Sequence, residues 1–149
     1  MEKGMPGWNM SIRTSLLPKH TNQHGTIFGG VILSLLDMAG AIEAKRFCAQ
    51  EVVTVAMKEV VFKKPVGVGD LVSFYTRITD FGHTSISTEI GVIAIRDDAL
   101  RSRVQVTNAH VTYVTIDRHR NAAPIHFQIS EEDPPAMTEQ CRKKFEAEM

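Results

Sequence analysis

The sequence predicts an α+β domain in which a five-stranded antiparallel sheet wraps around one long buried helix. A single long apolar stretch with helical periodicity covers residues 27–48 and precedes four consecutive runs that are rich in β-branched residues. No helical pattern separates these four runs, and one further strand-like run precedes the apolar stretch. Strands before and after one buried helix are typical of an α+β arrangement.

Size and composition indicate an ordinary globular protein. A chain of 149 residues with 17 basic and 17 acidic side chains has no net charge, so nothing indicates binding to nucleic acid or to an anionic membrane. Cys48 and Cys141 lack metal or redox spacing and are expected to be reduced thiols. The apolar stretch contains Asp37 and Glu43, which makes it too interrupted to span a bilayer, and no signal-peptide pattern precedes it. A cytoplasmic location is therefore expected.

The N-terminal half yields one strand and the helix. The strand is expected over residues 8–17, where Pro18 ends it, and the polar loop 19–26 follows. The helix is expected over residues 27–48. Apolar side chains occupy nearly every side of it as far as Ile42, so most of its circumference should be buried. Past Glu43 the pattern becomes amphipathic, and the helix is expected to leave the core there.

The remaining strands are expected over residues 52–62, 71–79, 84–95 and 103–116, and to pair as an antiparallel meander. This domain should cover residues 1–127, followed by a helical tail over residues 128–149. Ser130 is expected to cap the tail helix, with the acidic residues 131–133 in its first turn. Its apolar face, Met137, Cys141 and Phe145, should pack either on the domain or on a neighbouring subunit.

Asp37 is the first candidate for chemistry, because it is the only charged residue between positions 28 and 42. A carboxylate in apolar surroundings must be paired or used, since an unpaired buried charge is costly. No basic residue lies within one helical turn of it, so its partner must come from elsewhere in the fold or from another chain. The pattern alone leaves catalysis and a structural polar contact as equal alternatives.

The loop before the helix supplies the second candidate. Gly25, Gly29 and Gly30 either permit a tight turn or leave backbone N–H groups free for a phosphate or a developing oxyanion. Asn22 and His24 are solvated turn residues by default, and a general-base role for His24 is the alternative. The six histidines show no ligand spacing, so no metal site is expected.

Basic and hydroxyl side chains supply a third candidate for chemistry. Lys63 and Lys64 follow a strand, and the turn at Gly82–Ser85 offers backbone and hydroxyl donors. These residues are either solvated loop ends or parts of one pocket for a phosphorylated ligand.

The motif N-x-x-G-x-x-F-G-G over residues 22–30, followed by Asp37, Gly40 and Ala41, resembles the hotdog-fold acyl-CoA thioesterases. The branch it is most similar to contains the bacterial YciA-type and animal cytosolic acyl-CoA hydrolases. The resemblance continues through V-T-V-A at 53–56, F-x-x-P-V-x-V-G-D at 62–70 and G-x-T-S-I at 82–86, and covers residues 11–116. It implies the hotdog fold, in which two subunits pair edge to edge and active sites lie at the dimer interface. A homo-oligomer is thus expected, with a dimer as the minimum and a trimer of dimers as the common assembly.

The resemblance also implies roles for individual residues. Asp37 would be the catalytic carboxylate, acting as general base on water or as nucleophile, with Thr54 near the reacting centre. Asn22 would face Asp37 from the partner subunit, and the N–H groups of Gly29 and Gly30 would polarise the thioester carbonyl. The reaction would release free coenzyme A and a carboxylic acid without any cofactor.

Residues expected to bind the substrate are His24, Phe28, Lys63, Lys64, Pro65, Gly82, His83, Thr84 and Ser85. His83 departs from the family, whose members often carry Asn there, which puts that contact in doubt. Two other hypotheses remain: a non-catalytic acyl-CoA-binding hotdog protein, and a hotdog dehydratase. A dehydratase needs a histidine paired with the acidic residue, whereas the helix carries none. A regulator would add a DNA-binding segment, for which no room is expected before Trp8.

Overall fold

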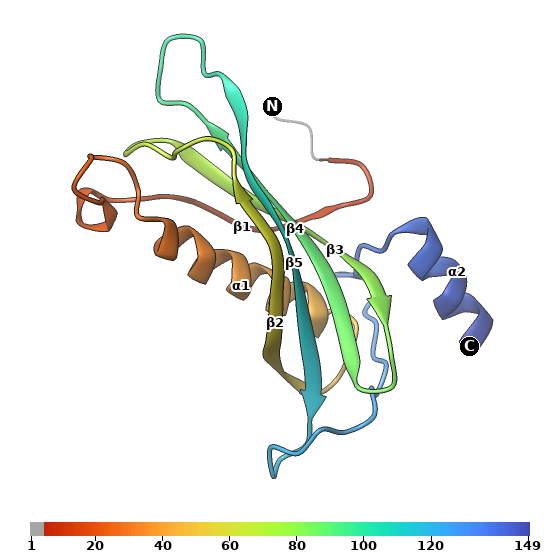
Figure 1. Cartoon of the computed structure of the whole chain (residues 1–149). Coiled ribbons are helices and arrows are strands. Elements are labelled where there is room, and N and C mark those ends of the chain that lie inside the picture. Colours follow the sequence, from red (N-terminus) through yellow and green to blue (C-terminus); the bar gives the residue numbers. More distant parts are fainter. Residues whose placement is uncertain (1–4) are drawn as a thin grey trace.

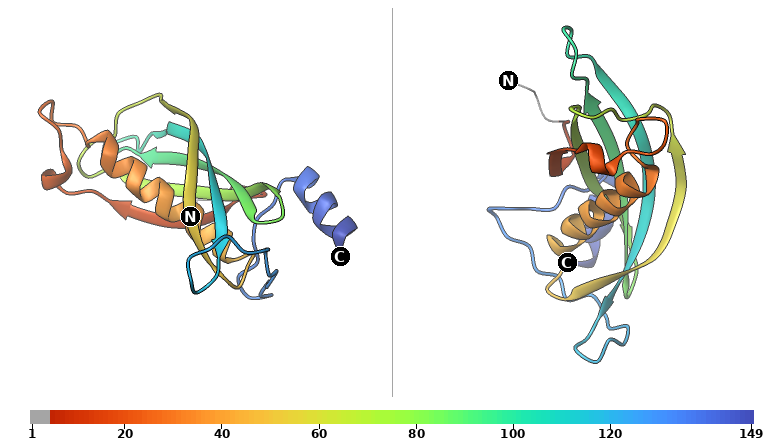
Figure 2. Two further views of the ribbon diagram at one scale, coloured as in Figure 1. Left: turned by 60° about the horizontal axis from the view of Figure 1, so that its bottom comes forward. Right: turned by 90° about the vertical axis from the view of Figure 1, so that its left-hand side faces the viewer.

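The computed structural model describes residues 5–149 and forms one sheet around one central helix (Figure 1). Its strands form a single antiparallel sheet in the order β1-β3-β4-β5-β2, and the sheet curves around α1 (Figure 2). The predicted α+β class is confirmed. The elements are β1 Asn9–Ser15, the 3-10 helix η1 Pro18–His20, α1 Gly29–Lys45, β2 Glu51–Phe62, β3 Leu71–Phe81, β4 Ser85–Ile95, β5 Arg103–Ile116 and α2 Glu139–Glu148.

The position of β2 differs from the predicted meander. β3, β4 and β5 do pair in sequence order, but β2 lies beyond β5 at the far edge of the sheet. The connection over residues 63–70 therefore crosses three inter-strand spacings, or about 14 Å. Eight residues can span about 26 Å, so this connection is long enough for the crossing. Alternating apolar residues identify a strand but not its neighbour, which is why the prediction failed here.

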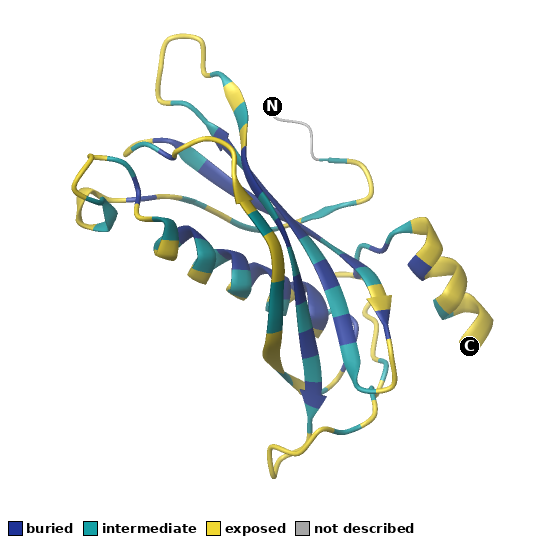
Figure 3. Ribbon diagram, viewed as in Figure 1, coloured by how far each residue is buried: buried dark blue, intermediate teal, exposed yellow. Residues whose placement is uncertain are grey.

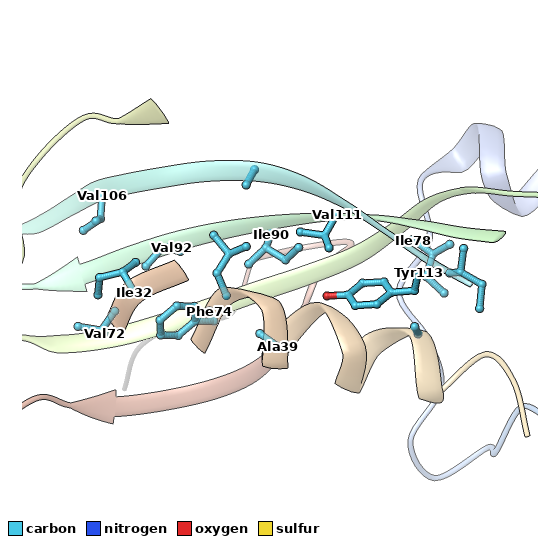
Figure 4. Packing of buried hydrophobic residues seen from close by; sticks show 14 of the residues in the cluster. Ile32, Ala39, Val72, Phe74, Ile78, Ile90, Val92, Val106, Val111 and Tyr113 are labelled. Atoms are coloured by element: carbon cyan, nitrogen blue, oxygen red, sulfur yellow. The ribbon is translucent and has the colours of Figure 1, made fainter. Parts of the chain in front are cut away.

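The core lies between α1 and the concave face of the sheet, where side chains from both elements interdigitate (Figure 4). One side of α1 is buried against β3, β4 and β5, while its opposite side is open (Figure 3). Met38 on that open side is 56% exposed, so the expectation that most of the helix circumference is buried is wrong for the single chain. Glu43, expected where the helix leaves the core, is 0% exposed.

The tail helix also begins later than predicted. α2 starts at Glu139, and its cap is Thr138, whose Oγ1 accepts a hydrogen bond from the backbone N–H of Cys141 at 3.2 Å. The hydroxyl of Ser130 instead accepts from the N–H of Glu132 within a local turn. Pro134 and Pro135 explain the difference, because a residue that precedes a proline disfavours helical geometry.

The tail packs on its own domain. Beyond the last residue of β3 that pairs with β1, the segment 136–138 forms a parallel bridge to Ile78. The N–H of Ile78 donates to the carbonyl of Ala136 at 2.7 Å, and the N–H of Thr138 donates to the carbonyl of Ile78 at 3.0 Å. Phe145 then completes a cluster of four phenylalanine rings with Phe47, Phe81 and Phe127, with centroids 5.0–6.3 Å apart.

No helix within residues 5–149 is long and apolar enough to cross a bilayer.

Candidate active site

Asp37 lies on the side of α1 that faces β2, and its half-buried carboxylate accepts two hydrogen bonds. The hydroxyl of Thr54 donates to Oδ1 at 2.7 Å. The hydroxyl of Tyr113 lies 3.2 Å from the same oxygen and 2.6 Å from the backbone carbonyl oxygen of Asp37. Within residues 5–149, no hydrogen bond ends on Oδ2. One oxygen of the carboxylate is thus held while the other is free for chemistry.

Tyr113 is the site residue that the sequence analysis missed. It lies on β5 and is 1% exposed, and its hydroxyl points toward α1 (Figure 4). Burial raises the pKa of Tyr113, and the nearby charge of Asp37 raises it further. The phenol therefore stays protonated and acts as a hydrogen-bond donor. Buried tyrosine hydroxyls usually find a partner, and this was the available signal. The sequence does not show that the partner is Asp37.

Gly40 allows this contact, because it lets α1 approach the sheet closely. A Cβ atom at Gly40 would overlap the hydroxyl of Tyr113. It would also lie 3.1 Å from both the Cδ1 of Ile90 and the Oγ1 of Thr88. Only glycine therefore fits at this position without displacing the helix.

The start of α1 brings several predicted residues together. Phe28 occupies the cap position of the helix, and its side chain makes no capping hydrogen bond. Phe28 is 58% exposed, and its ring lies over Gly30. Beside the helix start is a pocket of about 200 Å³ that contains Gly29, the basic pair and the proline predicted to bind substrate. Its lining residues are Ile27, Gly29, Ile32, Phe62, Lys63, Lys64, Pro65, Val66 and Val106.

Asn22 and His24 lie in the loop before the helix. The Oδ1 of Asn22 accepts hydrogen bonds from the N–H groups of His24 at 2.9 Å and Thr26 at 3.3 Å. Its Nδ2 donates to the hydroxyl of Thr26 at 3.1 Å, while His24 is exposed. Asn22 thus holds its own loop in shape and makes no hydrogen bond to Asp37 among the described residues.

The two parts of the predicted catalytic site are separated within one chain. Asp37 follows Gly29 by eight residues, which corresponds to about 12 Å along a helix. A general base acts within hydrogen-bond reach or through one water. Asp37 and the Gly29 N–H of the same chain therefore cannot act on one carbonyl group.

The two predicted sets of phosphate donors are also far apart, so within one chain they do not form the single pocket that was one of the two alternatives. The N–H of Lys63 donates to the carbonyl of Val106, whereas Ser85 pairs with Val114. These two β5 residues are eight positions apart, or about 27 Å along the strand.

The Gly82–Ser85 turn has several of its groups already engaged. The N–H of Gly82 donates to the carbonyl of Ser85 at 2.8 Å. The carbonyls of His83 and Thr84 accept from the N–H groups of Ile125 and Thr115. The structure thus places this turn in contact with the segment that follows β5, away from Gly29.

A second carboxylate on α1, Glu43, is fully satisfied inside the protein. The Nδ2 of Asn9 lies 3.1 and 3.2 Å from its two oxygens, and the hydroxyl of Thr76 donates to Oε1 at 2.8 Å. The N–H of Ala136 donates to Oε2 at 3.1 Å, and Arg46 lies 3.4 Å away. Burial nonetheless raises the pKa of Glu43, and these donors oppose that shift only in part.

No group of three or more His, Cys, Asp or Glu side chains in residues 5–149 is placed to hold a metal ion.

Comparisons with known proteins agree with the fold and identify the family. The thioesterase superfamily model matches residues 24–100. The acyl-CoA thioester hydrolase YciA of Salmonella typhimurium is 37% identical over 125 residues, covering 83% of this chain and 94% of the relative.

Solved structures give the same result. A hexameric hotdog fold thioesterase of Campylobacter jejuni is 42% identical, with a TM-score of 0.77 over 86% of this chain and 95% of that one. A hexameric broad specificity acyl-coenzyme A thioesterase is 32% identical, with a TM-score of 0.75 over 99% of this chain and 90% of that one. These likenesses confirm the predicted hotdog fold, and the chain belongs to the thioesterase superfamily.

Proposed function

We propose that the protein is an acyl-CoA thioester hydrolase that uses Asp37 as its catalytic carboxylate. The observation that carries this proposal is the asymmetry of Asp37, whose Oδ1 accepts two hydroxyl hydrogen bonds while Oδ2 accepts none within residues 5–149. The superfamily membership and the relatives named as acyl-CoA thioester hydrolases support the same reaction. No histidine hydrogen-bonds Asp37 among the described residues, which disfavours the dehydratase alternative.

The proposed site is assembled from two subunits, because the helix start and Asp37 of one chain are too far apart. One subunit supplies Asp37 and Thr54, and its partner supplies Asn22, Gly29 and Gly30. The free edge of β2 supports this pairing. Exposed apolar side chains on this strand, including Val55 at 56%, are suited to contact with another subunit. A dimer is therefore the minimum, and a trimer of dimers agrees with the hexameric relatives.

In the proposed reaction, Oδ2 of Asp37 removes a proton from a water molecule as the water oxygen adds to the thioester carbonyl carbon. The partner's backbone N–H groups at Gly29 and Gly30 stabilise the negative charge that develops on the carbonyl oxygen. The carbon–sulfur bond then breaks, and the proton passes to the departing thiolate. The products are a carboxylic acid and free coenzyme A. Direct attack by the carboxylate remains the alternative first step.

Lys63 and Lys64 are the proposed contacts for the phosphates of coenzyme A. Both line the pocket beside the helix start, and their positive charges suit the phosphate groups of the substrate. The turn at Gly82–Ser85 lies too far away to share this pocket. The cytoplasmic location and the lack of a cofactor remain predictions.

Asp37→Asn tests the proposal. Free-thiol release would be measured with short, medium, long and aromatic acyl-CoAs for the wild type and the variant. We expect kcat to fall by about 10²- to 10⁴-fold, because the change removes the base with almost no change in shape. Acyl-CoA binding and the unfolding transition should be retained. Wild-type turnover in the variant would contradict the mechanism, and binding without thiol release by the wild type would favour the non-catalytic alternative.

A further inference from the structure

The hydroxyl of Tyr113 contacts two atoms of one residue, the backbone carbonyl oxygen and the carboxylate Oδ1 of Asp37. The shorter distance, 2.6 Å, is to the backbone oxygen, and the carboxylate oxygen is 3.2 Å away. One hydroxyl proton is shared between these two acceptors. Tyr113 therefore fixes both the helical turn that carries Asp37 and the direction of its side chain.

The donor is rigid, because its surroundings hold it in place. Tyr113 is almost fully buried within β5, and its strand neighbours on β2 and β4 are Thr54 and Ile86. Gly40 removes the side chain that would otherwise occupy the position of the hydroxyl. A phenol buried in this way loses little further freedom when its hydrogen bond forms, so it can define the position of the carboxylate.

Two donors of different character converge on Oδ1. Thr54 is exposed on the edge strand, whereas Tyr113 approaches from the core. With both donors on one oxygen, rotation of the carboxylate would break both hydrogen bonds. The arrangement holds Oδ2 on the other side of the carboxylate, where no group of residues 5–149 donates a hydrogen bond to it.

We infer that Tyr113 is a positioning residue: its hydroxyl orients Asp37 so that Oδ2 meets the reacting water or the thioester carbon. This inference rests on the proposed hydrolase function. It means that a core residue of one subunit helps to align the catalytic base. Tyr113 itself is 1% exposed, so it acts on the reaction through Asp37.

Tyr113→Phe tests the inference, because it retains the buried ring and removes only the hydroxyl. We expect kcat for thiol release to fall by about 10- to 100-fold with KM nearly unchanged, since a misplaced catalytic group lowers the rate without weakening binding. Tyr75→Phe is the matched control, because Tyr75 is the other tyrosine of the chain and is also buried. Its kcat should equal that of the wild type.

The double variant Tyr113→Phe/Asp37→Asn separates positioning from general damage. If Tyr113 acts through Asp37, the double variant should be no slower than Asp37→Asn alone. A further loss of the same size as in Tyr113→Phe would overturn the inference, as would an unchanged kcat in the single variant.

Crystal structures of the wild type and Tyr113→Phe give a second readout that needs no turnover. We expect the Asp37 carboxylate to leave its position in the variant, and an unmoved carboxylate would overturn the inference. If the wild type releases no thiol, the proposed function fails, while the two structures still decide whether Tyr113 positions Asp37.

Discussion

The two carboxylates of α1, Asp37 and Glu43, differ in how completely the protein satisfies them. They are six residues apart, which places them about 120° apart around the helix. Asp37 faces β2 and, among residues 5–149, receives hydroxyl donors on one oxygen only. Glu43 faces β1, β3 and the tail, and receives donors on both oxygens as well as the charge of Arg46.

This difference shows that burial alone does not identify a functional carboxylate. Glu43 is the more deeply buried of the two, yet its lone pairs are occupied by a structural network. Asp37 is only half-buried, and one of its oxygens is left for another molecule. Unused hydrogen-bonding capacity in a fixed position is therefore the better guide to chemistry here.

Glu43→Gln should give the largest effect among the tests of this comparison. The free energy of unfolding should fall by about 2–3 kcal/mol. The side-chain N–H₂ group of glutamine cannot accept hydrogen bonds, so the donors that now contact one oxygen of Glu43 would lose their acceptor. The kcat for thiol release should stay close to that of the wild type. Urea unfolding and the thiol assay would measure the two quantities.

Glu51→Gln is the matched control for that variant. The exposed ion pair between Glu51 and Lys45, at 2.8 Å, should contribute less than about 1 kcal/mol. If Glu43→Gln abolished turnover and left the unfolding transition unchanged, the roles assigned to the two carboxylates would be reversed.

Gly40→Ala tests the part of α1 between the two carboxylates. The added methyl group would overlap the hydroxyl of Tyr113, so we expect a loss of about 1–3 kcal/mol in stability together with reduced kcat. Gly91→Ala is the control, because a Cβ there would approach no atom closer than 3.9 Å. Equal unfolding midpoints for these two variants would show that the helix does not depend on its close approach at Gly40.

The pH dependence of stability should give the smallest effect. Burial raises the pKa of Glu43 above its usual value of 4.5, so the folded state binds this proton more tightly than the unfolded state does. The resulting stabilisation is present below the unfolded pKa and is lost as pH rises through the folded pKa. The difference in unfolding free energy between wild type and Glu43→Gln should thus shrink as the pH is raised above 4.5. A difference that grew with pH would show that the donors outweigh the cost of burial.

The sequence predicted those features that depend on neighbouring residues. The spacing of apolar residues located the helix and all five strands, and the isolated charge marked Asp37. Features that join distant segments were not predictable in this way. The placement of β2 beside β5 depends on strand pairing, and the donors to Glu43 come from residues as far apart as Asn9 and Ala136.

The same distinction between local and distant features applies to the site residues. Resemblance identified Thr54, which does contact Asp37. Tyr113 was missed because an aromatic residue in a β-strand is normally a core residue, and its partner is 76 positions away. The start of α2 was misplaced because acidic residues after Ser130 imitate a helix start, although two prolines follow them.

The network around Glu43 has a consequence for the synthesis of the protein. Its hydrogen bonds join Asn9, on the first strand, to Ala136, in the segment that precedes α2. Until the segment around Ala136 has emerged, the edge of β3 at Ile78 is open and Glu43 lacks one of its donors. Folding of this domain is therefore completed only after the segment around Ala136 has been synthesised, and a chain that ended before Ala136 would carry an incompletely paired charge in its core.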